Sequence, residues 1–83
     1  MSTQKLKNVS LADYELFLTK AGCKHIRTNG GHKVYCRSDL TRPIVVQTHV
    51  DPVPEFIIKN ALRSLNYTKK DFFEILFADW NLT

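Results

Sequence analysis

Apolar residues recur at two different spacings along this chain, and each spacing predicts one kind of element. From Leu11 to Ala21 they stand three or four positions apart, which is the period of a helix that buries one face. Ser10 and Asp13 form a capping pair at the start of this run, and Gly22 suits its end. We therefore expect a helix that begins at Ser10 and closes at Gly22.

The period changes to that of strands after Gly22. Runs over residues 23–28, 32–37 and 44–48 alternate along the chain or are rich in β-branched residues. Asn29-Gly30-Gly31, between the first two runs, is the strongest turn signal in the sequence. Three such runs with short connections predict an antiparallel three-stranded meander.

Alternation divides the second run into two faces. Val34 and Cys36 share one face, whereas Lys33, Tyr35 and Arg37 share the other. We expect the apolar pair to face the core and the basic face, with its tyrosine, to be solvated.

Two further helices are expected after the strands. Residues 55–65 follow Pro54, which suits the first turn of a helix, and carry an apolar stripe that Asn66 can end. Thr68 and Asp71 repeat the capping pattern ahead of an aromatic-rich helix over residues 71–78. The order α-β-β-β-α-α predicts an α+β fold, with residues 1–83 forming one domain and residues 1–9 a loose lead-in.

Composition narrows the possible classes of protein. Eighty-three residues with 43% hydrophobic and 24% charged side chains suit one small globular core. Neither a run of about 20 apolar residues nor a secretory leader is present, so we expect a cytoplasmic protein with free thiols at Cys23 and Cys36.

The net charge of +4 is unevenly distributed along the chain. Eight basic against three acidic residues give +5 over residues 1–50, and four against five give −1 over residues 51–83. This distribution is compatible with a nucleic-acid partner.

A metal site is the first chemical alternative, because two thiols and two imidazoles lie close together in sequence. Four residues of regular strand span about 13 Å, so His32 and Cys36 cannot converge on one zinc ion. We therefore expect neither a metal nor another cofactor, and we interpret Cys36 as a core residue.

His32 is the sharpest candidate for catalysis. It follows a Gly-Gly turn at the mouth of a hairpin, with Lys33 beside it and Arg27 or Thr28 expected across the hairpin. Neighbouring cations favour a neutral imidazole, which a general base needs. Metal-free RNA cleavage requires a base for the 2′-hydroxyl proton and cations to stabilise the charged transition state. An exposed turn histidine without a role is the simpler alternative.

The sequence resembles the HicA toxins, which are small mRNA interferases of toxin–antitoxin modules. The resemblance runs from Lys7 to Leu76, about seven-eighths of the chain. It is carried by Val9-Ser10, Leu18-Thr19-Lys20-Ala21-Gly22, Arg27-x-x-Gly30-Gly31-His32-x-x-Tyr35-x-Arg37, Ile44–Val46, Ile58-x-x-Ala61-Leu62-Arg63 and Asn66-Tyr67-Thr68-x-x-Asp71-Phe72.

This resemblance implies a fold like that of double-stranded-RNA-binding domains, with helices on one face of the sheet. It also implies endoribonuclease activity centred on His32 and a HicB-type antitoxin that covers this histidine in a hetero-oligomer. The expected RNA-binding residues are Lys24, Arg27, Gly30, Gly31, Lys33, Tyr35 and Arg37.

The sequence departs from the family at Gly31, where a serine is usual, and in the short acidic stretch His49–Pro54. Both departures predict weaker binding of RNA. Two alternatives therefore stay open. One is a non-catalytic RNA-binding module of the same fold. The other is a protein-interaction subunit that engages its partner through Phe73, Phe77 or Trp80.

Overall fold

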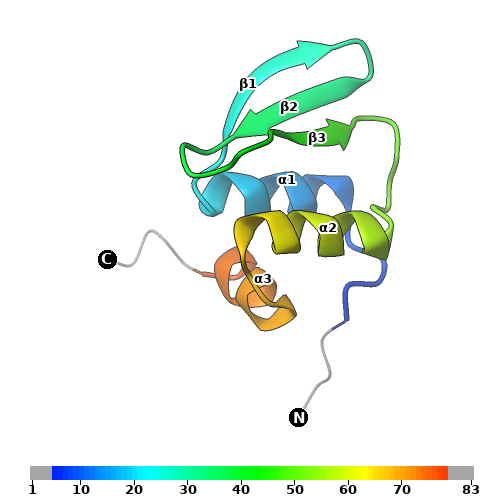
Figure 1. The fold of residues 1–83 in the computed structure, drawn as a ribbon. Helices are drawn as coiled ribbons and strands as arrows, with labels where there is room; N and C mark the ends of the chain where they lie inside the picture. The colour runs from blue at the N-terminus through cyan, green and yellow to red at the C-terminus, as the bar shows by residue number, and fades with distance from the viewer. Residues whose placement is uncertain (1–4, 79–83) are drawn as a thin grey trace.

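The computed structural model describes residues 5–78 and contains three helices and three strands (Figure 1). The elements follow the expected α-β-β-β-α-α order. They are α1 (Leu11–Lys20), β1 (Lys24–Asn29), β2 (His32–Cys36), β3 (Ile44–Gln47), α2 (Glu55–Leu65) and α3 (Lys69–Leu76).

The strands form one antiparallel sheet in the order β1-β2-β3, so β2 is central and β1 and β3 are edges. Figure 1 shows α1 and α2 next to the sheet and α3 on the far side of these two helices. The chain is thus a single α+β domain with its helices on one side of a three-stranded sheet, as the sequence predicted. Among residues 5–78, no helix has the length and apolar character needed to cross a membrane.

Local capping signals set the ends of the helices. The Ser10 hydroxyl accepts a hydrogen bond from the Asp13 backbone N–H, and Gly22 takes a φ of 92° just beyond the C-cap of α1. Thr68 and Asp71 form a reciprocal capping box. Because Thr68 is the N-cap, α3 begins at Lys69, two residues before the expected start, and Asp71 occupies its third position.

The β1–β2 hairpin closes through the two residues Gly30 and Gly31. Only Gly30 has a positive φ, at 61°, which is the pattern of a type II′ turn. A bulge between His25 and Arg27 shifts the register of β1. The two-residue turn itself places Asn29 opposite His32 and Thr28 opposite Lys33, so the expectation that Arg27 or Thr28 lies across from His32 is wrong.

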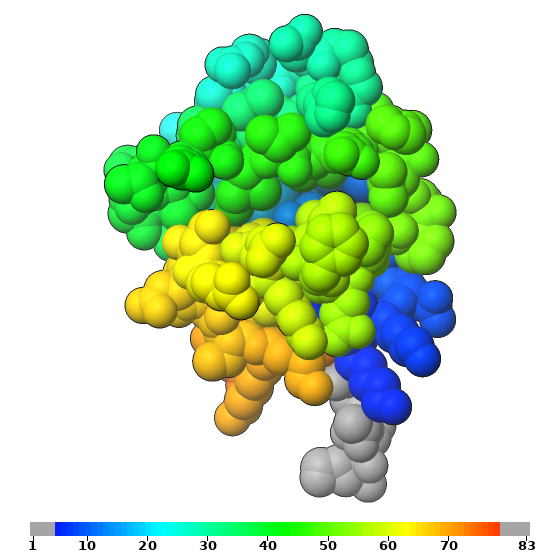
Figure 2. Space-filling model, turned by 45° about the vertical axis from the view of Figure 1, so that its right-hand side comes forward, coloured from blue at the N-terminus to red at the C-terminus, as the bar shows by residue number. Residues whose placement is uncertain are grey.

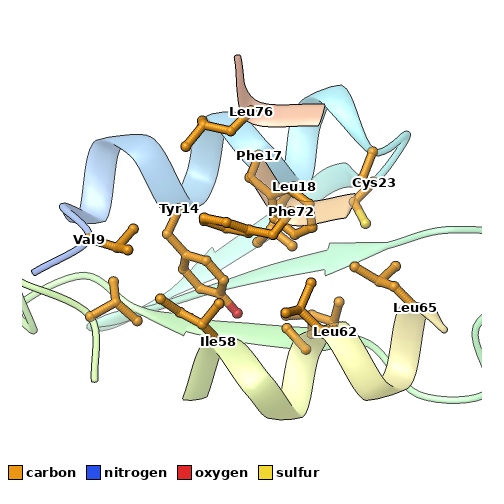
Figure 3. Close-up of a cluster of buried hydrophobic side chains, with 14 of the residues drawn as sticks. Val9, Tyr14, Phe17, Leu18, Cys23, Ile58, Leu62, Leu65, Phe72 and Leu76 are labelled. Atoms are coloured by element: carbon orange, nitrogen blue, oxygen red, sulfur yellow. The ribbon is translucent and has the colours of Figure 1, made fainter. Parts of the chain in front are cut away.

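One cluster of buried side chains joins the sheet to all three helices (Figure 3). Phe17 of α1 lies against Phe72 of α3, with ring centroids 4.6 Å apart. Leu6 is only 1% exposed and belongs to this cluster, and Val9 pairs with Val53. The expectation that residues 1–9 are a loose lead-in is therefore wrong for residues 6 and 9, which complete the core.

The faces of β2 are reversed relative to the expectation. Tyr35 is 5% exposed and belongs to the core cluster with its cross-strand partner Ile44, so this face meets the helices. Val34 is buried on the opposite, outer face, and Cys36 is half-buried there and outside the core cluster. The physical reason is that a tyrosine ring buries far more apolar area than a cysteine side chain. The prediction of a core role for Cys36 is wrong, although Cys23 is buried.

Candidate active site

His32 is the first residue of β2 and is exposed, directly after the Gly30-Gly31 turn that joins β1 to β2. It stands opposite Asn29 of β1 and Gln47 of β3. Residues paired across strands project to the same face. Because Lys33 pairs with the core residue Val46, the neighbouring His32 projects to the outer face, away from the helices.

Two of the predicted RNA-binding cations share this outer face. Arg27 pairs with Val34 and Lys24 pairs with Cys36, so both project to the same side of the sheet as His32. Both side chains are exposed. An exposed imidazole and two exposed cations on one sheet face can bind a phosphodiester backbone and move a proton at it.

Lys33 and Tyr35 are held on the opposite face by Glu15 of α1. The carboxylate accepts a hydrogen bond from the Tyr35 hydroxyl at 2.6 Å and one from Lys33 Nζ at 3.0 Å. Burial raises the pKa of Glu15, but the two hydrogen bonds together with the nearby charges of Lys33 and His25 hold this pKa below its ordinary value. Tyr35 is therefore not an exposed surface for stacking a base, contrary to the expectation of a solvated face.

Arg37 is likewise engaged within the protein. Its guanidinium forms a forked pair with the Asp39 carboxylate, at 2.6 and 2.8 Å. It also donates to the Ala21 carbonyl at 2.8 Å and to the Tyr67 hydroxyl at 2.9 Å, and it lies over the Tyr67 ring. Arg37 thereby ties the end of α1 to the chain between α2 and α3, which is a structural role.

The hairpin loop has a neighbour that the sequence interpretation missed. Thr48 donates from its backbone N–H and its hydroxyl to the Gly31 carbonyl, at 2.8 and 3.1 Å. A Cβ placed on Gly31 would lie 3.3 Å from Nδ1 of His49. A side chain at residue 31 would therefore require the exposed His49 ring to shift by a few tenths of an ångström. The antiparallel pairing of β2 with β3 is the signal that could have placed His49 there.

Glu15 was also missed, although the sequence carries a signal for it. It stands four residues after Leu11 and three before Leu18, on the stripe that helical spacing assigns to the core. A carboxylate on that stripe needs a buried partner. Tyr35 and Lys33 supply that partner.

The residues considered for zinc do not form a ligand set. Within residues 5–78, no three histidine, cysteine, aspartate or glutamate side chains are gathered so that they could hold one ion. His25 instead lies beside Tyr35, with ring centroids 5.4 Å apart, and its Nε2 is 2.9 Å from the Thr28 hydroxyl.

Comparison with known proteins identifies no relative: no family model, no curated protein and no solved structure matches the chain.

Proposed function

We propose that this protein is a HicA-type toxin, an endoribonuclease that cleaves mRNA with His32 as its catalytic residue. The observation that carries the proposal is the outer face of the sheet, where the exposed His32 shares one surface with the exposed cations Lys24 and Arg27. The motif resemblance centred on Gly30-Gly31-His32 supports the same residue. An mRNA substrate implies a cytoplasmic site of action.

In the proposed reaction, His32 takes the proton from a ribose 2′-hydroxyl. The 2′-oxygen then attacks the adjacent phosphorus, and the 5′-oxygen of the next nucleotide leaves and takes a proton from water. Negative charge builds on the phosphate oxygens during the attack. Arg27, opposite Val34 and two positions along the strand from His32, stabilises this charge, whereas Lys24, opposite Cys36, binds the backbone farther along the face. The mechanism requires no metal ion.

The proposed RNA contacts are fewer than the sequence suggested. Lys24, Arg27 and the Gly30-Gly31 turn remain, because they stand on the outer face or at the hairpin end. Lys33, Tyr35 and Arg37 leave the set, because their polar groups are bound to other residues of the protein. A smaller set of phosphate contacts predicts a shallower dependence of RNA affinity on salt concentration.

The same face has the features of a surface that an antitoxin could cover. Ile26 and Val45 are 50% and 48% exposed, and Val45 pairs with the outer-face residue Val34. Apolar side chains around a charged centre suit the buried middle of a protein interface. We therefore propose that a HicB-type antitoxin packs on Ile26 and Val45 and thereby covers His32.

The test is incubation of the purified protein with single-stranded RNA in EDTA. His32→Ala should lower the cleavage rate by about 10²- to 10⁴-fold, the usual contribution of a general base. His25→Ala is the matched control, because it removes an exposed histidine whose ring lies beside Tyr35 on the other face. This control should cleave like the wild type.

Cleavage that survives His32→Ala, or that requires Mg²⁺, would show the mechanism to be wrong. Binding of RNA by the wild type without cleavage would favour the non-catalytic RNA-binding module instead.

A further inference from the structure

A hollow of about 370 Å³ lies between β3 and α2, within the size range of small-molecule sites. Figure 2 shows it between the green atoms of β3 and the yellow atoms of α2, with blue atoms of α1 at its floor. Its walls are mainly apolar and include Leu11, Val46 and Ile57. His32 also contributes to the lining, although its side chain projects to the outer face, so the hollow opens close to the end of β2 at which His32 stands.

The hollow contains one buried polar group without a partner. Tyr14, which lines it, is 1% exposed, and among the described residues its hydroxyl makes no hydrogen bond. Figure 3 shows the ring reaching from α1 toward α2 and ending beside Ile58. Burial raises the pKa of Tyr14 above its ordinary value, so the hydroxyl stays protonated and can both donate and accept. A buried hydroxyl without a partner is costly, which is a reason to look for a ligand.

Two further polar side chains line the hollow from α2. Asn60 and Ser64 stand four residues apart on this helix, so they lie on one of its faces. The amide of Asn60 offers both donors and an acceptor. Apolar walls with a few such groups are the means by which proteins hold an unstacked RNA base and read its Watson–Crick edge.

We propose that this hollow binds one unpaired base of the RNA, next to the phosphodiester that His32 attacks. This inference rests on the proposed function and adds sequence preference to it. When a base enters the hollow, the backbone of its nucleotide lies near His32, because His32 is among the residues that line the hollow. Single-stranded RNA is therefore the favoured substrate, and the base in the hollow selects the cleavage position.

A peptide strand added to the open edge of β3 is the competing occupant. Its main chain would pair along Ile44–Gln47. Tyr14, with its unpartnered hydroxyl, and Asn60, with its amide, line the hollow from α1 and α2, whereas main-chain pairing would use only the edge of β3. Directed polar groups at these positions favour a base.

The test uses 2′-O-methyl oligonucleotides of A, C, G or U, which bind but cannot be cleaved, with affinity measured by fluorescence anisotropy. The wild type should prefer one base. Tyr14→Phe should reduce that preference about 2- to 10-fold, the range for one neutral hydrogen bond. Ser64→Trp should fill the hollow and weaken binding of the preferred oligonucleotide. Thr19→Trp, on an exposed position of α1 outside the hollow, is the matched control and should bind like the wild type.

Folding is checked separately by thermal unfolding. Tyr14→Phe keeps the ring and removes an unpartnered hydroxyl, so its unfolding midpoint should equal or exceed that of the wild type. Base ranking that is unchanged in both Tyr14→Phe and Ser64→Trp overturns the inference. A second result also overturns the inference. If Ser64→Trp keeps the ranking of the four bases but no longer binds an antitoxin peptide, the hollow binds a protein strand.

The two proposals fail in different ways. If the wild type cleaves RNA and both variants cleave it at the same positions, the base site is wrong and the endoribonuclease stands. If the wild type does not cleave but loses its base preference in Tyr14→Phe, the base site stands and the endoribonuclease is wrong.

Discussion

Replacing Glu15 by glutamine removes the charge that holds α1 to the inner face of β2. The Tyr35 hydroxyl donates to this carboxylate at 2.6 Å from a nearly buried position, and a hydrogen bond to a charged group is worth about 1.5–3 kcal/mol. The pair with Lys33 is worth less, because 34% of that side chain is exposed and solvent screens the interaction. Glutamine still offers one neutral acceptor, so we expect Glu15→Gln to cost about 2 kcal/mol.

The assay is urea unfolding followed by circular dichroism, with thermal unfolding alongside. A loss of about 2 kcal/mol lowers the unfolding midpoint by roughly 8–16 °C in a domain of this size. The pKa of Glu15 is lower in the folded protein than in the unfolded chain, so its contribution is present above the unfolded pKa and is lost as pH falls through the folded pKa. The difference between wild type and variant should therefore be full at neutral pH and narrow as the pH falls below the ordinary pKa of a glutamate toward the lower pKa of folded Glu15.

Glu74→Gln is the matched control. Glu74 forms an exposed pair with Lys70 at 3.9 Å, and such a pair contributes less than about 0.5 kcal/mol. A Glu15→Gln variant that is no more destabilised than this control at neutral pH would show that the Glu15 charge does not hold α1 to β2. A destabilisation that is the same at neutral and at acidic pH would show the same.

Three further substitutions test other parts of the structure. Gly31→Ser places a Cβ 3.3 Å from Nδ1 of His49, so we expect the His49 ring resonances to shift in NMR spectra and the unfolding free energy to fall by about 1 kcal/mol. Thr68→Ala removes the N-cap of α3 and should lower the thermal midpoint by roughly 4–8 °C, while an unchanged midpoint would mean that the cap contributes nothing. Arg37→Lys cannot reproduce the guanidinium fork, so chemical denaturation should show a loss of about 2 kcal/mol; a loss below about 0.5 kcal/mol contradicts the structural role of this residue.

The elements were predictable because their signals are local. Ser10, Gly22 and Thr68 act on the helix ends next to them, and the Gly30-Gly31 turn acts on the two strands that it joins. Such signals are read within a few residues of chain, and the observed strands differ from the predicted ones by a residue at most at either end.

The orientation of the sheet was not predictable in the same way. Alternation separates two faces of β2 but does not say which face the helices cover. That choice also depends on Glu15, which is distant from Tyr35 in sequence. Its carboxylate accepts hydrogen bonds from the Tyr35 hydroxyl and from Lys33 Nζ on the inner face. Of the aromatic residues considered for a protein partner, Phe77 is 65% exposed, Phe73 is buried in the core, and Trp80 lies outside the described residues. Phe56 is as exposed as Phe77.

The packing of Leu6 and Val9 has a consequence for how the protein is made. These residues are synthesised before the rest of the domain, whereas Val53, which pairs with Val9, follows more than forty residues later. The ring of Phe72, against which Phe17 packs, is synthesised later still. A nascent chain therefore cannot complete its core until α3 has been translated, so the fold forms from nearly the whole chain at once. A ribosome stalled before α3 would present a domain with an incomplete core, and an ordered outer face would be expected only after α3 has been translated.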